Sequence, residues 1–224
     1  MANVGFRQYL SINRPQKAIL ELFTGIPSPI IDDSMNRVYG LSGLKPYNNA
    51  PLLGAAFTVK CPDGDNLMFN RAIDIAEPGD ILVVDAGGAM DRALCGEIMI
   101  SHAIHRGLGG FIVNGCVRDS EYIASCGFPV YALGLSPNGP FKNGPGEINV
   151  PVVAGGMAVL PGDILVGDAD GLVVIRPPDA EEVAAKARQQ KETEHKLLVT
   201  IAAGKWDRSN FIQILADKGC EIIS

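Results

Sequence analysis

The stretch that decides the fold is DILVVDAGGAMDRALCGEIMISHAIHRGLGGFIVNGCVRD, residues 80–119. It holds two apolar runs, 80–85 and 111–113, and residues 93–106 between them carry apolar side chains at helical spacing. Short apolar runs without polar alternation are typical of strands that are covered on both faces. The order strand, helix, strand therefore predicts a right-handed crossover and a parallel section of sheet.

The same alternation continues on both sides of this stretch. We expect a helix over 28–40, which Ser28 would cap and Pro29 would open. Further elements are expected as a strand at 52–61, a helix at 66–76, a short helix at 119–125 and a strand at 129–135.

The pattern changes after Ser136. Residues 137–147 are rich in Gly, Pro and Asn, which indicates turns. Strands are expected at 148–153, 163–167 and 171–176, too close together for intervening helices, so this half should be antiparallel or mixed sheet. Helices are expected at about 179–203 and 207–218. The sequence thus predicts one α/β domain over residues 1–224, with a mixed sheet, flanking helices and a C-terminal helical extension over 179–224.

One hexapeptide occurs twice. PGDILV stands at 78–83 and again at 161–166. In each copy Pro fixes φ, Gly allows a tight bend, and Asp can bond the backbone of the turn. The two copies lie in different contexts, so they indicate recurrent turn chemistry and not a repeat array.

The composition narrows the class of protein. Hydrophobic residues make up 47% of the 224 residues and charged residues 20%, which is enough for a sizeable core. A net charge of −6 argues against nucleic acid or an anionic membrane as the main partner. The sequence has no long apolar run and no signal-peptide pattern, and its five cysteines form no C-x-x-C pair, so we expect a cytoplasmic protein with reduced thiols.

Arg118 and Asp119 follow a predicted strand, at the sheet edge where α/β proteins place ligands. Aspartate is a hard oxygen ligand for Mg²⁺ or Mn²⁺, and arginine offers a forked donor to a carboxylate or an oxyanion. Glu97 could add a second carboxylate, and the backbone N–H groups of residues 96–99 could hold an anion if a helix begins there. The alternative is a surface pair in which Asp119 caps the following helix.

Other candidates carry weaker signals. His102 and His105 have helical spacing but no third ligand near them, and His195 lies in a charged helix, so surface histidines are expected. The glycines after Asp85 do not match a dinucleotide or methyl-donor loop. Cys116 has no adjacent base and is expected to be a structural thiol. Trp206 and Phe211 are candidate anchors of a subunit interface.

The run ALCGEIMISHAIHRGLGGFIVNGCVRD, followed by GFPVYALG and later VLPGDILVGDADGLVVI, resembles a known family. That family contains the 4-hydroxy-4-methyl-2-oxoglutarate / 4-carboxy-4-hydroxy-2-oxoadipate aldolases and the regulator of ribonuclease E activity A. The resemblance covers about residues 28–175 firmly and the C-terminal helices more loosely. It implies a swivelling β/β/α domain that assembles as homotrimers or homohexamers.

The resemblance also implies roles for particular residues. In the aldolases an acid, twenty intervening residues and Arg-Asp form the metal site, and Glu97 with Arg118 and Asp119 matches that spacing. Asp119 would then bind Mg²⁺ (or Mn²⁺) directly, and Glu97 would hold a metal-bound water. Arg118 would bind the keto or enolate oxygen, and the amides of Gly96, Glu97, Ile98 and Met99 would receive the substrate carboxylate.

Two positions depart from the family's pattern. Where the aldolases often carry an acid three residues after the Asp, this chain has Tyr122, with Glu121 beside it. The family's acid from a neighbouring subunit would be Glu192 or Glu194 here. The resemblance implies a metal-dependent lyase that cleaves 4-hydroxy-2-oxo dicarboxylic acids to pyruvate, with oxaloacetate decarboxylation as a side activity. The alternative is a non-catalytic ring that binds and regulates an endoribonuclease.

Overall fold

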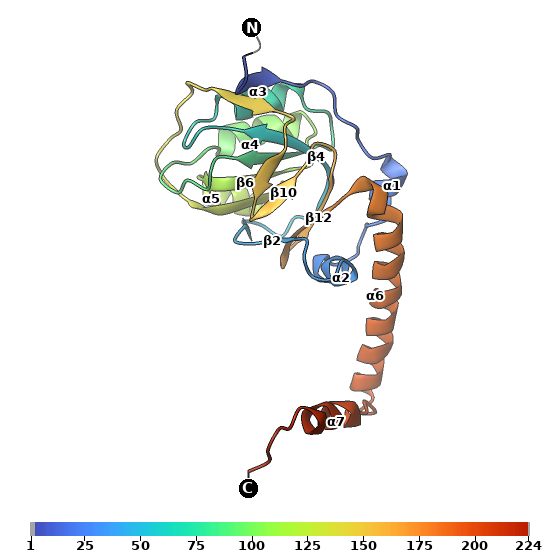
Figure 1. Ribbon diagram of the computed structural model, residues 1–224. Coiled ribbons are helices and arrows are strands. Elements are labelled where there is room, and N and C mark those ends of the chain that lie inside the picture. The colour runs from blue at the N-terminus through green and yellow to red at the C-terminus, as the bar shows by residue number, and fades with distance from the viewer. Residues whose placement is uncertain (1–2, 224) are drawn as a thin grey trace. The chain divides into compact units, whose positions relative to one another are not determined.

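The computed structural model describes residues 3–223, and Figure 1 labels its elements. The chain forms two compact units, one up to Ala187 and one from Arg188 onward.

A mixed sheet is the framework of the first unit. Within the described residues ten strands form one sheet, in the order β2-β12-β11-β4-β5-β6-β7-β3, with β8 pairing β4 and β1 pairing β8. The bounds along that order are β2 Gly40–Leu41, β12 Gly171–Ile175, β11 Ile164–Asp168, β4 Leu52–Lys60, β5 Ile81–Asp85, β6 Gly110–Val117, β7 Val130–Leu135 and β3 Lys45–Pro46, with β1 Phe6–Gln8 and β8 Gly146–Ile148 off this path. A separate hairpin joins β9 Val152–Ala154 to β10 Met157–Val159.

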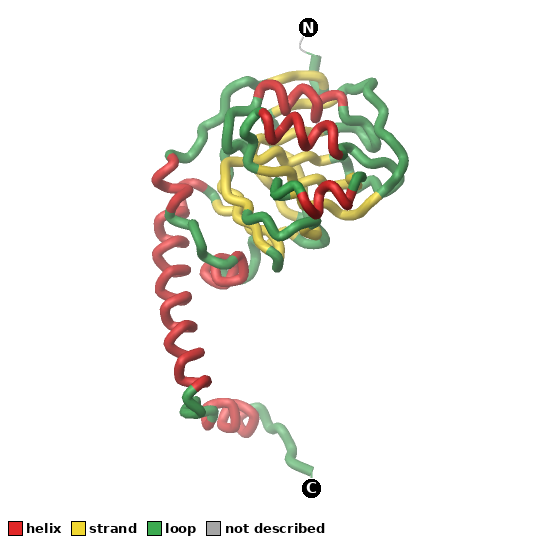
Figure 2. The backbone as a smooth tube through the Cα atoms, turned by 180° about the vertical axis from the view of Figure 1, so that it is seen from behind, coloured by secondary structure: helices red, strands yellow, loops and turns green. Residues whose placement is uncertain are grey.

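The centre of the sheet is parallel, as the alternating pattern predicts. Strands β4, β5, β6 and β7 pair in parallel in that order. Three helices connect them and lie against one face of the sheet, as Figure 2 shows: α3 Leu67–Ile75, α4 Glu97–His105 and α5 Ser120–Ser125. The layer between helices and sheet is a cluster of buried apolar side chains.

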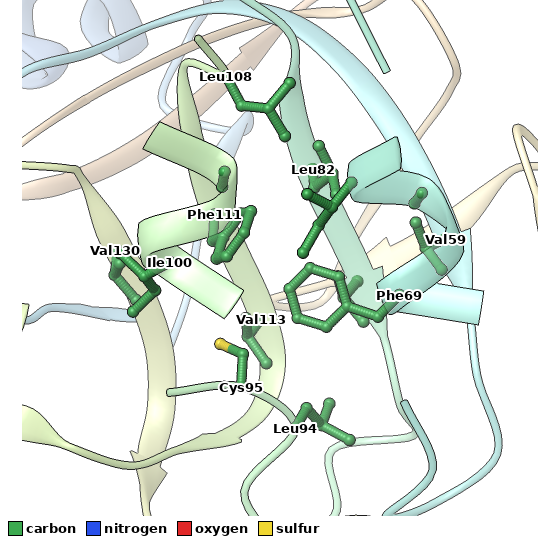
Figure 3. Packing of buried hydrophobic residues seen from close by; sticks show 14 of the residues in the cluster. Val59, Phe69, Leu82, Leu94, Cys95, Ile100, Leu108, Phe111, Val113 and Val130 are labelled. Carbon is green, nitrogen blue, oxygen red and sulfur yellow. The ribbon is translucent and has the colours of Figure 1, made fainter. Parts of the chain in front are cut away.

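Aromatic rings fill the middle of that layer. Phe111 of β6 contacts Phe69 of α3 and Phe128 edge-to-face, with ring centroids 4.9 and 5.0 Å apart. Figure 3 shows Phe69 and Phe111 side by side among Leu82, Val113 and Ile100. Edge-to-face pairs of this kind add to the free energy gained from burial. The same cluster includes Ile100 of α4, so α4 packs against β6, the strand that ends directly before Arg118.

The other half of the sheet is antiparallel, which confirms the predicted mixed sheet. β11 pairs antiparallel with both β12 and β4. Two helices of the N-terminal part, α1 Lys17–Glu21 and α2 Ser28–Ser34, contribute side chains to the cluster beside β11 and β12.

Three local predictions are wrong. The helix expected over 28–40 ends at Ser34, because Asn36 and Arg37 both adopt a positive φ of 62°. Ser28 lies inside this helix and does not cap it; its N–H and hydroxyl both donate to Asp168 at 2.7 Å. The strand expected at 148–153 is two short strands, since Asn149 between them has a positive φ of 59°.

The repeated hexapeptide forms the same turn twice. Gly79 and Gly162 both have φ of 88°, a conformation that favours glycine. Asp80 accepts from the N–H of Glu77, and Asp163 accepts from the N–H of Leu160, three residues earlier in each case. Both aspartates are 2% exposed. The predicted bond between Asp and the turn backbone is confirmed in both copies.

Each of these buried aspartates also pairs with an arginine from outside its turn. Arg14 donates two hydrogen bonds to Asp80, at 2.9 and 2.7 Å. Arg176 forms an ion pair with Asp163, and burial raises the pKa of that carboxyl while Leu160 and Arg176 lower it. Buried carboxylates need such partners, because an unpaired buried charge is costly.

The C-terminal helices agree with the expected ones. A 3₁₀ turn at Pro177–Asp179 leads into α6, Ala180–Ala202, and α7 spans Ser209–Asp217. The buried face of α6 is confined to its first turns, at Ala180, Val183, Ala184 and Ala187. Across residues 3–223, no helix has the length and apolar character that a membrane span requires.

We predict that Asp80→Ala lowers the free energy of unfolding by about 3 kcal/mol, since it leaves Arg14 and the N–H of Glu77 without their buried acceptor. Urea unfolding followed by circular dichroism measures the change. The matched control is Arg37→Ala, which removes an ion pair whose arginine side chain is 75% exposed and should cost less than about 1 kcal/mol. Equal losses in the two variants would contradict the structural role assigned to Asp80.

Candidate functional site

The loop before α4 is fastened to the end of β6 by backbone hydrogen bonds. The N–H of Leu94 donates to Cys116 at 2.8 Å, and the N–H of Arg118 donates to Cys95 at 3.0 Å. The helix predicted from residue 93 therefore begins only at Glu97. The pairing competes with helix formation here and holds residues 93–96 beside the strand.

Asp119 comes next to the start of α4 as a result. Its φ of 60° and ψ of 45° are left-handed, which is uncommon outside glycine. Its Oδ2 accepts a hydrogen bond from the N–H of Glu97 at 2.8 Å. Asp119 does occupy the cap position of α5, as the alternative proposed, but its side chain makes no cap bond there. The carboxylate caps α4 instead.

Gly96 makes this approach possible. Its φ is −161°, an extended conformation open to any residue, so backbone freedom is not the reason for glycine. A Cβ at this position would overlap Asp119 Oδ2 and would lie 2.9 Å from Cγ of Arg118. The missing side chain provides the space that Arg118 and Asp119 occupy.

The first turn of α4 presents free backbone donors. Ile100 is the first residue of the helix whose N–H bonds within it, to Gly96, and Asp119 takes the N–H of Glu97. Among the described residues no acceptor takes the N–H of Ile98 or Met99. Free N–H groups at the positive end of a helix attract anions. The anion site at residues 96–99 was predicted on the condition that a helix begins there, and α4 does begin at Glu97.

These groups line one pocket with a volume of about 140 Å³. Its polar contributors include Arg118 and Asp119, whose Nε and Oδ2 are 3.8 Å apart, and Lys142. The remaining walls are Asn66, Asn70, Leu94, Cys95, Gly96, Ile98, Met99 and Pro140. The pocket thus combines two cationic side chains, one carboxylate and a helix N-terminus. This combination suits a small anionic ligand that carries a second polar group.

Lys142 and Asn66 were not predicted from the sequence. The segment that carries Lys142 is held to the residues before α3: Asp65 accepts from the N–H groups of Asn143 and Gly144, and Phe141 donates to Gly64 at 2.8 Å. A usable signal was present, because Lys142 is the one cation in the turn-rich stretch 137–147. Asn66, the first residue of the helix predicted at 66–76, gave no such signal.

Some predicted residues lie outside the pocket. Glu97 contributes its backbone, but its side chain is exposed and is not among the lining residues. The hydroxyl of Tyr122 bonds the hydroxyl of Ser101 at 2.8 Å, which ties α5 to α4, and Glu121 is exposed. Glu192 and Glu194 belong to the second unit, on α6. Their predicted role in a neighbouring subunit stays a prediction.

Asp119 fits a hydrated divalent cation. Its Oδ2 is engaged by Glu97, whereas no described donor bonds its Oδ1. In residues 3–223 no group of three or more His, Cys, Asp or Glu side chains is placed to hold a metal ion. Mg²⁺ retains several waters and often binds one or two carboxylates, so a single aspartate with a substrate is compatible with it.

The remaining candidates are structural. The ring of His102 bonds Asp74 at 3.1 Å on the surface, and His105 and His195 are exposed. Cys116 is buried and donates to the carbonyl of Met90 at 3.4 Å. Burial raises the pKa of the Cys116 thiol, which argues against a nucleophile, as expected.

Comparison with known proteins gives the family. The protein-family model described as "RraA-like: Aldolase/RraA" matches residues 28–174 of this chain. This chain belongs to that family. One relative, named "Putative 4-hydroxy-4-methyl-2-oxoglutarate aldolase" in Halalkalibacterium halodurans, is 39% identical over 171 residues, which is 75% of this chain and 81% of that protein.

Solved structures of similar proteins support the fold. An uncharacterised protein from Pseudomonas syringae matches with a TM-score of 0.76 and 25% identity, over 86% of this chain and 96% of its own. The structure described as the RNA-processing inhibitor RraA from Thermus thermophilis matches with a TM-score of 0.61 and 29% identity, over 66% of this chain and 92% of its own. Members of the family therefore bear both aldolase and inhibitor names.

We predict that a thiol reagent at pH 8 labels Cys220 rapidly in the native protein and leaves Cys61 and Cys95 unlabelled. Cys220 is exposed, whereas burial raises the pKa of Cys61 to about 12 and raises that of Cys95 further. The thiolate is the reactive form, and it is scarce below the pKa. Mass spectrometry of labelled peptides measures the order. Fast labelling of Cys95 would mean that the pocket wall is open, contrary to the structure.

Proposed function

We propose that this protein is a divalent-metal-dependent aldolase. Its substrates would be 4-hydroxy-2-oxo dicarboxylic acids such as 4-hydroxy-4-methyl-2-oxoglutarate, and pyruvate would be a product. The observation that carries the proposal is the arrangement at Gly96: Arg118, Asp119 and the free N–H groups of α4 line one pocket. The aldolase name of the 39% identical relative supports the reaction class.

The pocket would bind the oxo acid at three points. The N–H groups of Ile98 and Met99 would hold the carboxylate next to the keto group. Arg118 would donate to the keto oxygen, and Lys142 would attract the distal carboxylate. A divalent cation on Asp119 would supply Lewis-acid polarisation of the keto group.

Cleavage follows from the same contacts. When the hydroxyl at C4 loses its proton to water, the C3–C4 bond breaks and C4 becomes a carbonyl carbon. The bonding electron pair moves into the pyruvate enolate, whose negative charge resides on the former keto oxygen. Arg118 would stabilise that charge because its guanidinium is positioned before the charge develops. A proton from water at C3 then gives pyruvate. Oxaloacetate decarboxylation forms the same enolate, so we propose it as a side activity.

We also propose that the active form is a homotrimer or homohexamer. Asp119 is the one acidic side chain among the residues that line the described pocket. Glu192 or Glu194 from a neighbouring copy could supply a further carboxylate to hold metal-bound water, with Glu97 at the rim.

We predict that the purified protein releases pyruvate from 4-hydroxy-4-methyl-2-oxoglutarate only with Mg²⁺ or Mn²⁺, and that a chelator stops the release. Arg118→Ala should lower kcat at least about a hundredfold, since it removes the donor to the developing oxyanion. Asp119→Asn tests the proposed cation site more directly than alanine would. Its amide oxygen can still cap α4, while the negative charge that would bind the cation is lost. Coupled pyruvate assays with a metal titration measure both effects.

Full activity in these variants would contradict the site. The alternative function, suggested by the inhibitor name of one structural relative, predicts a different result. A non-catalytic regulator would show no metal-dependent turnover of any oxo acid and would form a measurable complex with an endoribonuclease.

We predict that Gly96→Ala lowers kcat/KM roughly a hundredfold, because the new methyl group displaces the Asp119 carboxylate from its position. The fold should persist, since alanine tolerates the extended backbone at this position. Gly40→Ala is the matched control: its Cβ would meet Asp32 at an ordinary 3.7 Å, and Gly40 does not line the pocket. Similar kinetics for the two variants would show that Gly96 has no special role.

A further inference from the structure

The side-chain amide of Asn66 is buried, and its oxygen has no hydrogen-bond donor among the described residues. Asn66 stands at the start of α3 and is 2% exposed. Its Nδ2 donates to the carbonyl of Leu94 at 2.7 Å, and no described donor reaches its buried Oδ1. The reverse orientation of the amide would set two acceptor oxygens against each other, so this assignment of N and O is the favourable one.

The amide lies in the wall of the pocket. Leu94 and Met99, which Nδ2 contacts, both line the pocket together with Asn66. A buried acceptor without a partner costs free energy, and in native proteins such a group usually has an ordered water, an ion or a ligand beside it. A bound ligand that brings a donor would remove this cost.

The donors and acceptors of the pocket indicate which group of a ligand would pair with Asn66 Oδ1. Arg118, Lys142 and the free N–H groups of α4 are donors, so they match the carboxylates and keto oxygen of an oxo acid. At neutral pH a 4-hydroxy-2-oxo dicarboxylate has one hydrogen-bond donor of its own, the hydroxyl at C4. Among the residues that line this pocket, the buried side-chain acceptor without a donor is Asn66 Oδ1.

We propose that Asn66 Oδ1 accepts a hydrogen bond from the hydroxyl of the bound oxo acid and so selects hydroxylated ligands. This inference rests on the proposed function for the class of ligand. An amide oxygen does not take the proton at neutral pH, so Asn66 recognises and orients the hydroxyl and is a specificity-determining residue. A ligand that lacks the hydroxyl leaves Oδ1 unpaired, and sites of this kind discriminate strongly against such analogues.

The test uses two ligands that cannot be cleaved because they lack the keto group: 2,4-dihydroxyglutarate and 2-hydroxyglutarate. They differ only in the hydroxyl at C4. Isothermal titration calorimetry of the full chain with Mg²⁺ should show that the dihydroxy compound binds roughly tenfold or more tightly. Asn66→Ala should abolish the difference. Asn70→Ala is the matched control and should keep it, because this asparagine lines the same pocket but its amide already bonds the backbone of Asn66.

Equal affinity of the wild-type chain for the two ligands, or no binding of either, would overturn the inference, and so would an Asn66→Ala variant that keeps the preference. Thermal unfolding establishes whether Asn66→Ala is folded; if it is not, the wild-type comparison still decides. Turnover is measured separately. A chain that shows the preference but releases no pyruvate would refute the proposed aldolase and retain the hydroxyl recognition.

Discussion

The arrangement of the pocket depends on one stretch of backbone pairing, between residues 93–96 and the end of β6. These residues have the apolar spacing of a helix, but the N–H of Leu94 bonds Cys116 in β6 and the carbonyl of Cys95 accepts from the N–H of Arg118, directly after that strand. The start of α4 is thereby delayed to Glu97. A helix that began at residue 93 would consume the N–H groups of Ile98 and Met99 in its own hydrogen bonds. The pairing keeps those donors available and places Asp119 beside them.

Asp119 shows how one carboxylate can serve structure and chemistry together. One oxygen caps α4, and the left-handed backbone of Asp119 turns the side chain back toward that helix. The other oxygen is left without a protein donor. The pocket is also cationic in a protein whose net charge is −6, because Arg118 and Lys142 both reach it. Local placement of charge, and not the total, governs which ligands such a pocket attracts.

The sequence predicted what depends on local pattern. The buried runs at β5 and β6, the parallel order of the central strands and the twin Pro-Gly-Asp turns all follow from spacing and residue type. The spacing of Glu97 from Arg118 and Asp119 predicted that all three belong to one site, and the N–H of Glu97 does bond the Asp119 carboxylate, but the spacing could not show that the Glu97 side chain is exposed. Asn66 and Lys142 reach the pocket through the fold, by way of the hydrogen bonds of Asp65, and no local pattern encodes that approach.

The two Pro-Gly-Asp turns limit how far the chain can be truncated. The family match covers residues 28–174, whereas the arginines that neutralise the two turns, Arg14 and Arg176, lie outside it on either side. A fragment trimmed to the matched region would retain Asp80 and Asp163 in the interior and discard both counter-charges. The boundary of sequence similarity is therefore narrower than the boundary of the folding unit, and the flanking segments belong to any minimal version of the domain.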